Sequence, residues 1–164
     1  MTSISIRAAR AEDADAILHC LAIAFEPVRE QYTAAGYADT VLTAETVRQR
    51  LASMALFVAE SDGRIVGTIG GRVKSPGHGH VRGMAVLPEA QGSGAAGLLL
   101  RAVEDELRDR NCSRVTLNTT APLQRAIRFY EKNGYRRTGR VSDFFGMELY
   151  EYEKTLSPGG GRQF

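Results

Sequence analysis

The sequence has few cysteines, no long apolar run and almost no net charge. Cys20 and Cys112 lack the spacing of a metal site, so we expect two small buried side chains, no bound metal and a reducing, cytoplasmic location. No apolar run reaches about 18 residues, which predicts no membrane span. Residues 1–10 carry charge, which predicts no signal peptide. A formal net charge of +2 is too small to indicate a nucleic-acid or membrane partner.

The remaining composition is that of one globular domain. Hydrophobic residues make up 43% of the 164 residues and charged residues 24%. This length corresponds to a single domain, which we place at residues 1–156. The end of the chain, 157–164, is rich in glycine and follows the last apolar pattern, so we predict a flexible tail there.

The central stretch of the sequence runs from Val81 to Leu107. Alternating apolar residues predict a strand that ends before Pro88, because proline has no N–H to donate to a sheet. An amphipathic helix is predicted from about Leu98 to Arg110. The six residues directly before the helix are all small: Gly92, Ser93, Gly94, Ala95, Ala96 and Gly97. A strand, a small-residue turn and a helix bring free backbone N–H groups to the positive end of the helix dipole, which predicts an anion site.

From the residues alone, several interpretations of this turn are possible. The glycines fit G-x-G-x-x-G, but a dinucleotide site also needs an acid after the next strand, and that strand ends in Asn118-Thr119-Thr120. A P-loop is excluded because no Gly-Lys followed by Ser or Thr comes after these glycines. The turn could also need small residues only for packing.

Two motifs resemble the GNAT N-acetyltransferase superfamily. Residues 91–96, with Gln91, Gly94 and Ala96 at the fixed places, resemble its [RQ]-x-x-G-x-[GA] signature. Residues 126–135, which include Tyr130, resemble its A-x-x-[LF]-Y-x-[KR]-x-G-[FY] helix and turn. The motifs occur in the family's order with a strand between them, and the resemblance covers nearly the whole chain.

The resemblance implies acetyl-CoA as acyl donor. It implies that the cofactor's pyrophosphate lies on the backbone N–H groups of residues 91–96, and that the pantetheine arm pairs with a central strand. It also implies that Tyr130 protonates the leaving thiolate. Many family members carry an Asn where this chain has Leu123, and we expect Asn118 to replace that contact. The predicted cofactor-binding residues are Met84, Ala85, Val86, Gln91, Gly92, Ser93, Gly94, Ala95, Ala96 and Asn118.

The general base and the acceptor stay open. His78, His80, Glu60 and Glu89 are candidate bases, and none is assigned. The acceptor is expected to be a small-molecule or peptide amine, in a pocket walled by the first two helices and the last hairpin. Aromatic candidates for that pocket are Phe25, Tyr32, Tyr37, Phe144 and Phe145. An acyl-CoA-binding module without catalysis is an alternative function, and a homodimer is possible.

The predicted fold class is α+β. Strands are predicted over 4–7, 55–60, 64–73, 80–86, 113–118, 136–141 and 147–154. Helices are predicted over 12–25, 28–35, 44–54, 98–110 and 123–132, with Arg48 and Arg50 in solvent. Together with the resemblance, they predict a twisted, mostly antiparallel sheet of seven strands with one splayed parallel pair and helices on both faces.

Overall fold

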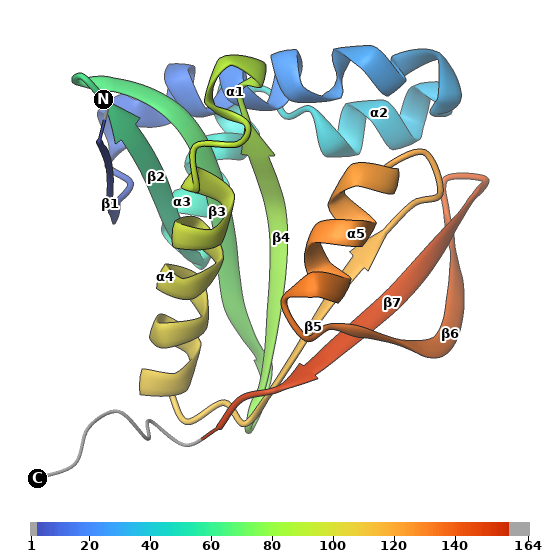
Figure 1. The fold of residues 1–164 in the computed structure, drawn as a ribbon. Helices are drawn as coiled ribbons and strands as arrows, with labels where there is room; N and C mark the ends of the chain where they lie inside the picture. The colour runs from blue at the N-terminus through green and yellow to red at the C-terminus, as the bar shows by residue number, and fades with distance from the viewer. Residues whose placement is uncertain (1–2, 158–164) are drawn as a thin grey trace, which may run out of the picture.

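A mixed sheet of seven strands forms the centre of the protein, in the order β1-β2-β3-β4-β5-β7-β6 (Figure 1). The computed structural model describes residues 3–157. The strands are β1 Ile4–Ala8, β2 Ala55–Ser61, β3 Arg64–Ser75, β4 His78–Val86, β5 Arg114–Thr119, β6 Arg136–Phe144 and β7 Met147–Thr155. Within the described residues, β4 and β5 are the one parallel pair, and the other neighbours are antiparallel. The predicted fold class is therefore confirmed.

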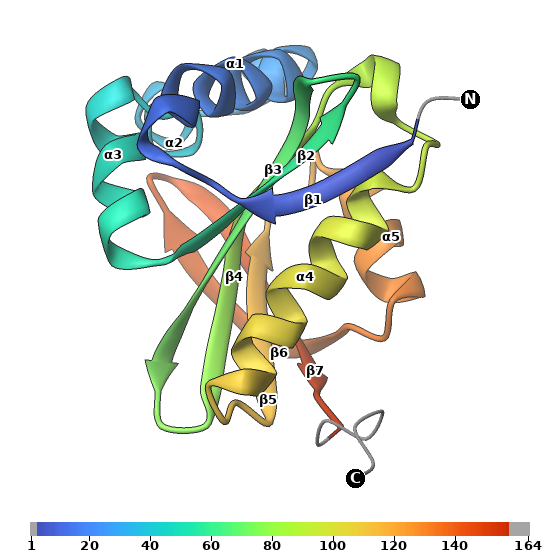
Figure 2. The ribbon, with the colours of Figure 1, turned by 90° about the vertical axis from the view of Figure 1, so that its left-hand side faces the viewer.

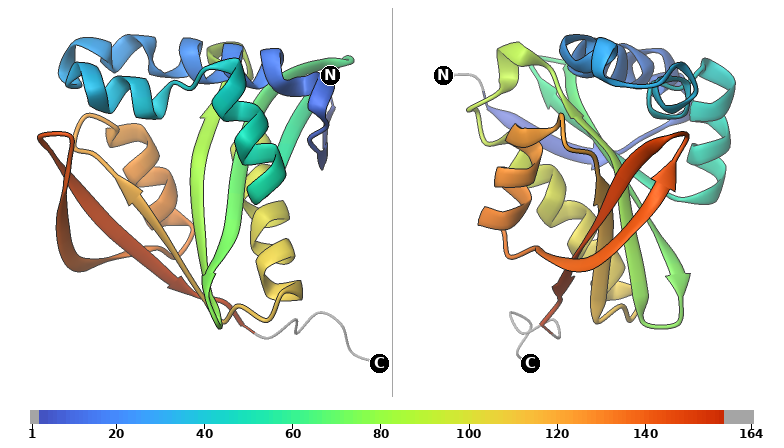
Figure 3. Two further views of the ribbon diagram at one scale, coloured as in Figure 1. Left: turned by 180° about the vertical axis from the view of Figure 1, so that it is seen from behind. Right: turned by 90° about the vertical axis from the view of Figure 1, so that its right-hand side faces the viewer.

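Helices cover both faces of the sheet, as predicted. The helices α1 Ala14–Phe25, α2 Ala34–Thr40 and α3 Ala44–Ser53 lie on one side, and α4 Ala95–Asp109 and α5 Gln124–Lys132 lie on the other (Figure 2; Figure 3). Short 3-10 helices connect the elements: η1 Ala11–Asp13, η2 Glu26–Gln31 and η3 Pro88–Ala90. The core consists of side chains from both layers, with Leu21, Val58, Leu99 and Val103 almost fully buried.

The parallel pair separates along its length. β4 pairs with β5 only over His78–Val81 and Arg114–Leu117, and beyond that point the strands diverge (Figure 1). On its other edge β4 keeps pairing with β3, but Gly83 and Met84 together stand opposite a single β3 residue. Gly83 has φ +68°, a conformation that favours glycine, so a bulge bends β4 where it leaves β5.

The glycines of β3 let the helices approach the sheet closely. A Cβ on Gly71 would lie 2.5 Å from Val103 of α4, and a Cβ on Gly67 would lie 3.0 Å from Leu99. On the other face, a Cβ on Gly70 would lie 2.6 Å from Leu56. The sequence-based interpretation of these glycines as points of close approach is confirmed.

Some predicted boundaries were wrong. The helix predicted over 28–35 is instead η2 followed by α2, which begins after Thr33 because the Thr33 hydroxyl accepts a hydrogen bond from the Gly36 N–H at 3.1 Å. β4 starts at His78 rather than at residue 80, and α4 starts at Ala95 rather than near Leu98. Residues 158–164 of the predicted flexible tail lie outside the described residues.

Both cysteines are buried and unpaired, as expected, with Cys20 at 0% and Cys112 at 3% exposure. No helix within residues 3–157 combines the length and apolar character needed to cross a bilayer. The same residues contain no group of three His, Cys, Asp or Glu side chains placed to hold a metal ion.

Candidate functional site

A cleft of about 1130 Å³ opens where β4 and β5 separate. It runs from the start of α4, along β4 and α5, to η2 and the tip of the β6–β7 hairpin. Its lining includes nearly all the predicted site residues: Met84, Ala85, Val86, Gln91, Gly92, Gly94, Ala95, Ala96, Asn118 and Tyr130. Ser93 is not part of the lining. Its hydroxyl instead bonds to the Ala90 carbonyl and accepts from the Ala95 N–H at 3.3 Å, which closes the turn.

The glycines before and inside α4 face open space. Gly92 and Gly94 have φ values of +82° and +90°, which other residues rarely adopt, and Gly97 lies in the helix. A Cβ added at any of the three would meet no atom within 4 Å. Packing therefore does not require small residues here, which argues against the packing-turn interpretation.

The start of α4 can hold an anion. Gly94 is the N-cap residue and provides no side-chain cap, and the Ala95 N–H donates to the Ser93 hydroxyl, which leaves the N–H groups of Ala96 and Gly97 without partners inside the helix. These groups and the positive end of the helix dipole point into the cleft beside Gly92 and Gly97. The residues present therefore fit a pyrophosphate group.

Two features of the strands fit an extended ligand next to this anion site. From Arg82 to Val86, β4 pairs with β3 on one edge, and β5 has left the other edge. Thr119, at the end of β5, lines the cleft and is 3% exposed. Its hydroxyl is the single buried side-chain N or O atom among residues 3–157 without a hydrogen-bond partner. A ligand with amide groups would satisfy these positions.

Tyr130 projects from α5 toward the bulge of β4. Its hydroxyl lies 3.8 Å from the Met84 sulfur, and its ring packs edge-on against Phe129 and Tyr135. The side chain is 7% exposed, and burial raises the pKa of its phenol. Tyr130 is therefore a neutral O–H donor at pH 7, placed where the two strands part.

One candidate base lies in the cleft. His80 is 8% exposed, lines the cleft, and has its Nδ1 2.8 Å from the Thr116 hydroxyl. The same hydroxyl lies 2.7 Å from Nε2 of His78, so the three side chains form a continuous polar chain. Burial, followed by the charge of Lys74, lowers the pKa of His80 to about 4. The imidazole is therefore neutral at pH 7, and its low pKa makes it a weak proton acceptor.

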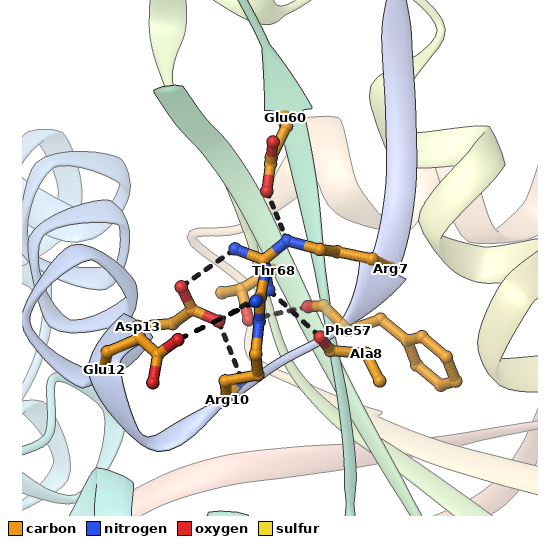
Figure 4. A network of polar contacts seen from close by, with 8 residues as sticks. All are labelled: Arg7, Ala8, Arg10, Glu12, Asp13, Phe57, Glu60 and Thr68. Carbon is orange, nitrogen blue, oxygen red and sulfur yellow. Dashed lines mark hydrogen bonds and ion pairs between the residues drawn. The ribbon is translucent and has the colours of Figure 1, made fainter. Parts of the chain in front are cut away.

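The two carboxylate candidates lie elsewhere. Glu60 pairs with Arg7, which also binds Asp13 through two hydrogen bonds of 2.7 and 2.9 Å, in a network that ties β1 to η1 and β2 (Figure 4). Glu89 pairs with Arg64 at 2.8 Å. Neither carboxylate lines the cleft. Each forms an ion pair with an arginine outside it.

Comparison with known proteins decides between the readings of this cleft. Residues 16–135 match the Acetyltransferase (GNAT) family. The chain belongs to this family. The resemblance noted in the sequence is thereby confirmed, and the chain is placed among enzymes, the N-acetyltransferases that the family comprises.

Curated relatives of this GNAT protein are moderately similar. It is 35% identical to S-(2-succino)cysteine N-acetyltransferase of Bacillus subtilis over 143 residues, which cover 81% of this chain and 84% of the relative. It is 40% identical to the probable N-acetyltransferase family 8 member 5 of Mus musculus over 92 residues, or 53% of this chain. That match spans only 40% of the mouse protein.

Solved structures share the fold of this GNAT protein at low sequence identity. PaiA N-acetyltransferase of Thermoplasma acidophilum, solved with coenzyme A, has a TM-score of 0.78 at 17% identity, covering 94% of this chain and 99% of that one. The ribosomal-protein-S18-alanine N-acetyltransferase of Escherichia coli has a TM-score of 0.75 at 18% identity, covering 99% of both chains. These similarities show the fold.

The GNAT chain departs from the family's pattern at the start of α5. Leu123 is the N-cap residue and has no polar side chain to cap the helix or reach a ligand. Asn118, the predicted replacement, is exposed at the end of β5 and lines the cleft. Its position is compatible with that role.

The far end of the cleft contains some of the expected aromatic residues. Phe25, Tyr32 and Phe144 line it, and the Tyr32 hydroxyl lies 2.6 Å from the Thr120 hydroxyl. Tyr37 is not among the lining residues, and neither is Phe145, which is 50% exposed. The first helices and the last hairpin therefore meet at this end of the cleft.

Sequence reasoning missed the charged residues of the cleft. Arg50 was expected in solvent, but it is only partly exposed and lines the cleft with Asp39 and Arg82. The expectation failed because Arg50 lies one helical turn after Val47, a fully buried residue that anchors α3 to the core. Nothing in the sequence near Arg50 signals that β4 comes close to this part of α3.

Proposed function

We propose that this protein transfers an acetyl group from acetyl-CoA to a primary amine by direct attack in a ternary complex. The observation that supports this most is the open, uncapped start of α4 beside a splayed strand pair, with one buried tyrosine aimed into the opening. Family membership makes acetyl-CoA the expected donor. The Bacillus relative's name makes amino acid derivatives reasonable first acceptors to try.

Residues 91–97 hold the pyrophosphate in this proposal, and the free edge of β4 at Met84 to Val86 pairs with the pantetheine amides. Thr119 offers its unpaired hydroxyl to the same arm. The bound donor supplies a thioester, whose carbonyl carbon the amine attacks and whose C–S bond then breaks. The protein's part in the reaction is to orient the thioester, take a proton from the amine and give one to the sulfur.

Tyr130 gives the proton in this proposal. The Tyr130 hydroxyl, adjacent to Met84, donates its proton to the departing sulfur, because a buried phenol with a raised pKa is protonated before the reaction. A second proton leaves the attacking amine. His80 lines the cleft, but its low pKa makes it a weak acceptor for that proton, so we assign no general base.

The first test measures donor binding and turnover separately. A thermal shift with acetyl-CoA reports binding, because a ligand at 100 times its Kd stabilises a protein by about 2.7 kcal/mol. Release of free thiol with a panel of amines reports transfer. Binding together with amine-dependent thiol release is the expected result. Binding without release from any amine would favour the alternative of a non-catalytic acyl-CoA module, and no binding would overturn the proposal.

A further inference from the structure

Arg50 is one of the charged side chains of the cleft that acetyl transfer as described above does not use, with Asp39, Arg82, Arg125, Arg128 and Lys132. Arg50 comes from the last turn of α3, and its guanidinium crosses to the bulge of β4. A Cβ on Gly83 would lie 3.1 Å from Nη1 of Arg50, so this nitrogen lies directly over the backbone at Gly83. No larger residue fits between them without moving the guanidinium.

This guanidinium has no partner within the part of the chain that the structure describes. Residues 3–157 supply it with neither a hydrogen bond nor an ion pair, although it is only partly exposed. The nearby carboxylate, Asp39, pairs at 3.5 Å with another cation, Arg82. Burial, followed by repulsion from Arg82, lowers the pKa of Arg50 to about 10, so Arg50 still carries its charge at pH 7. Two cations therefore share one carboxylate at this end of the cleft.

The location of Arg50 connects this charge to the reaction. Gly83 precedes Met84, whose sulfur lies 3.8 Å from the Tyr130 hydroxyl. The unpaired guanidinium and the buried phenol therefore approach the same bulge of β4. An amine held for attack at this bulge therefore has the Arg50 guanidinium beside it.

We propose that Arg50 binds a carboxylate of the acceptor, so that the acceptor class is an amino acid or another amine with a carboxylate close to the nitrogen. A guanidinium donates two parallel N–H bonds to a carboxylate, and the partly buried setting strengthens them. The excess positive charge at the same place disfavours polyamines, which would bring further cations. This inference rests on the proposed function, since it concerns the acceptor of that reaction.

The test compares matched amines, with and without the carboxylate. Phenylalanine and phenethylamine form one pair, and methionine and 3-(methylthio)propylamine form another, with spermidine and a short peptide as further acceptors. Each acceptor is offered at several millimolar, above the usual KM range of about 1 μM to 1 mM, together with acetyl-CoA. The expected result is that the amino acid of a pair is acetylated at least tenfold more efficiently than its decarboxylated partner.

Two variants on the same helix sharpen the test. Arg50→Gln removes the guanidinium of the cleft, and we expect KM for the amino acid to rise about 10- to 100-fold, the range for losing a charged hydrogen bond. Its thermal shift with CoA should be unchanged, because the phosphates bind at the start of α4. Arg48→Gln makes the same charge change at an exposed position two residues away and should leave KM unchanged.

Other outcomes overturn the inference. The inference is wrong if an amine without a carboxylate is acetylated as efficiently as its amino acid partner. It is also wrong if Arg50→Gln and the parent protein have equal KM values for the amino acid. If Arg50→Gln lost the CoA shift instead, Arg50 would serve the donor and not the acceptor. Acetylation of spermidine or the peptide alone would overturn this inference while leaving the proposed function intact. Failure of the parent protein to bind CoA would count against the proposed function itself.

Discussion

The two ends of the cleft are built in different ways. The end at α4 is a continuous stretch of backbone, residues 91–97. The N–H groups of Gln91, Ser93 and Ala95 bond within the turn, and the small residues leave the approach to the others open. The end at α3 is made of side chains from elements far apart in sequence, among them Tyr32 of the segment after η2, Arg50 of α3 and Phe144 of β6. The shape of the first end depends on backbone conformation, and the shape of the second end depends on the identity of its side chains.

Under the proposed function, the donor would bind at the end made of backbone and the acceptor at the end made of side chains. A phosphate site made of backbone tolerates few changes, because φ values near +90° at Gly94 restrict the residue type. A pocket made of side chains changes with each substitution that folds. The predictions below probe the two ends separately.

The largest expected effect lies between the two ends, at Tyr130. We expect Tyr130→Phe to lower kcat by about 10²- to 10⁴-fold, the usual contribution of a positioned proton donor. Steady-state kinetics with any accepted amine would measure it. The CoA thermal shift should stay, because the ring still packs against Phe129 and Tyr135. A kcat within threefold of the parent value would remove Tyr130 from the proton-donor role.

At the proposed donor end, substitutions of Gly97 should change CoA affinity and protein stability in opposite directions. Gly97→Glu adds a carboxylate beside the proposed pyrophosphate, and we expect CoA affinity to fall about 100-fold, since charges about 4 Å apart repel by roughly 1–4 kcal/mol. The free protein should melt at a higher temperature, because Glu replaces Gly in the first turn of a helix. Gly97→Ala is the matched control, with the same gain in helix propensity and no charge. Equal CoA affinity in both variants would place the phosphates elsewhere.

The stability of the folded protein should depend on pH through His80 of β4. Burial, followed by the charges of Lys74, Arg82, Arg72 and His78, lowers the pKa of His80. Because the pKa falls from 6.5 in the unfolded chain to about 4, the folded state disfavours the proton, and stability is lost as pH falls below 6.5. We expect His80 to contribute a loss of about 1.5 kcal/mol between pH 6.5 and pH 5. His80→Asn should remove this contribution and leave that of His78, whose pKa is also lowered.

Urea denaturation at the two pH values measures this loss. The exposed His19 provides the control, since His19→Asn should keep the full pH dependence of the parent protein. The same slope in His80→Asn as in the parent protein would contradict the assignment of the pH dependence to His80.

The smallest expected effect is at Thr119, on the donor side. Thr119→Val removes the hydroxyl that has no partner in the described protein, so we expect the free protein to be equally stable or more stable by up to about 1 kcal/mol. CoA affinity should fall about 3- to 10-fold if the hydroxyl bonds to the donor, as one hydrogen bond predicts. Titration calorimetry would measure this change. An unchanged affinity would assign the unpaired hydroxyl to the acceptor end or to no ligand.

The order and type of most elements could be predicted from the sequence. Apolar periodicity and turn residues identified every strand, and Asp62-Gly63 marked the tight β2–β3 hairpin, where both residues have positive φ. The segment after Pro27 was predicted wrongly, because a cap at Thr33 starts α2 later than the apolar pattern suggests. Boundaries depend on such single hydrogen bonds, which a pattern of apolar residues does not contain.

By itself the sequence determined the end of the cleft at α4, where the donor is proposed to bind. The glycines and alanines of 92–97 specify their backbone conformation locally, so their N–H groups and their family resemblance are visible in a short stretch. Only the tertiary structure decided the acceptor end. Arg50, Arg82 and Asp39 come together because α3 packs against α1 and β2, from where the long Arg50 side chain reaches β4 at Gly83, and this long-range packing leaves no local pattern around any of the three. Their charges acquire a role only through that proximity and through the loss of solvent that accompanies it.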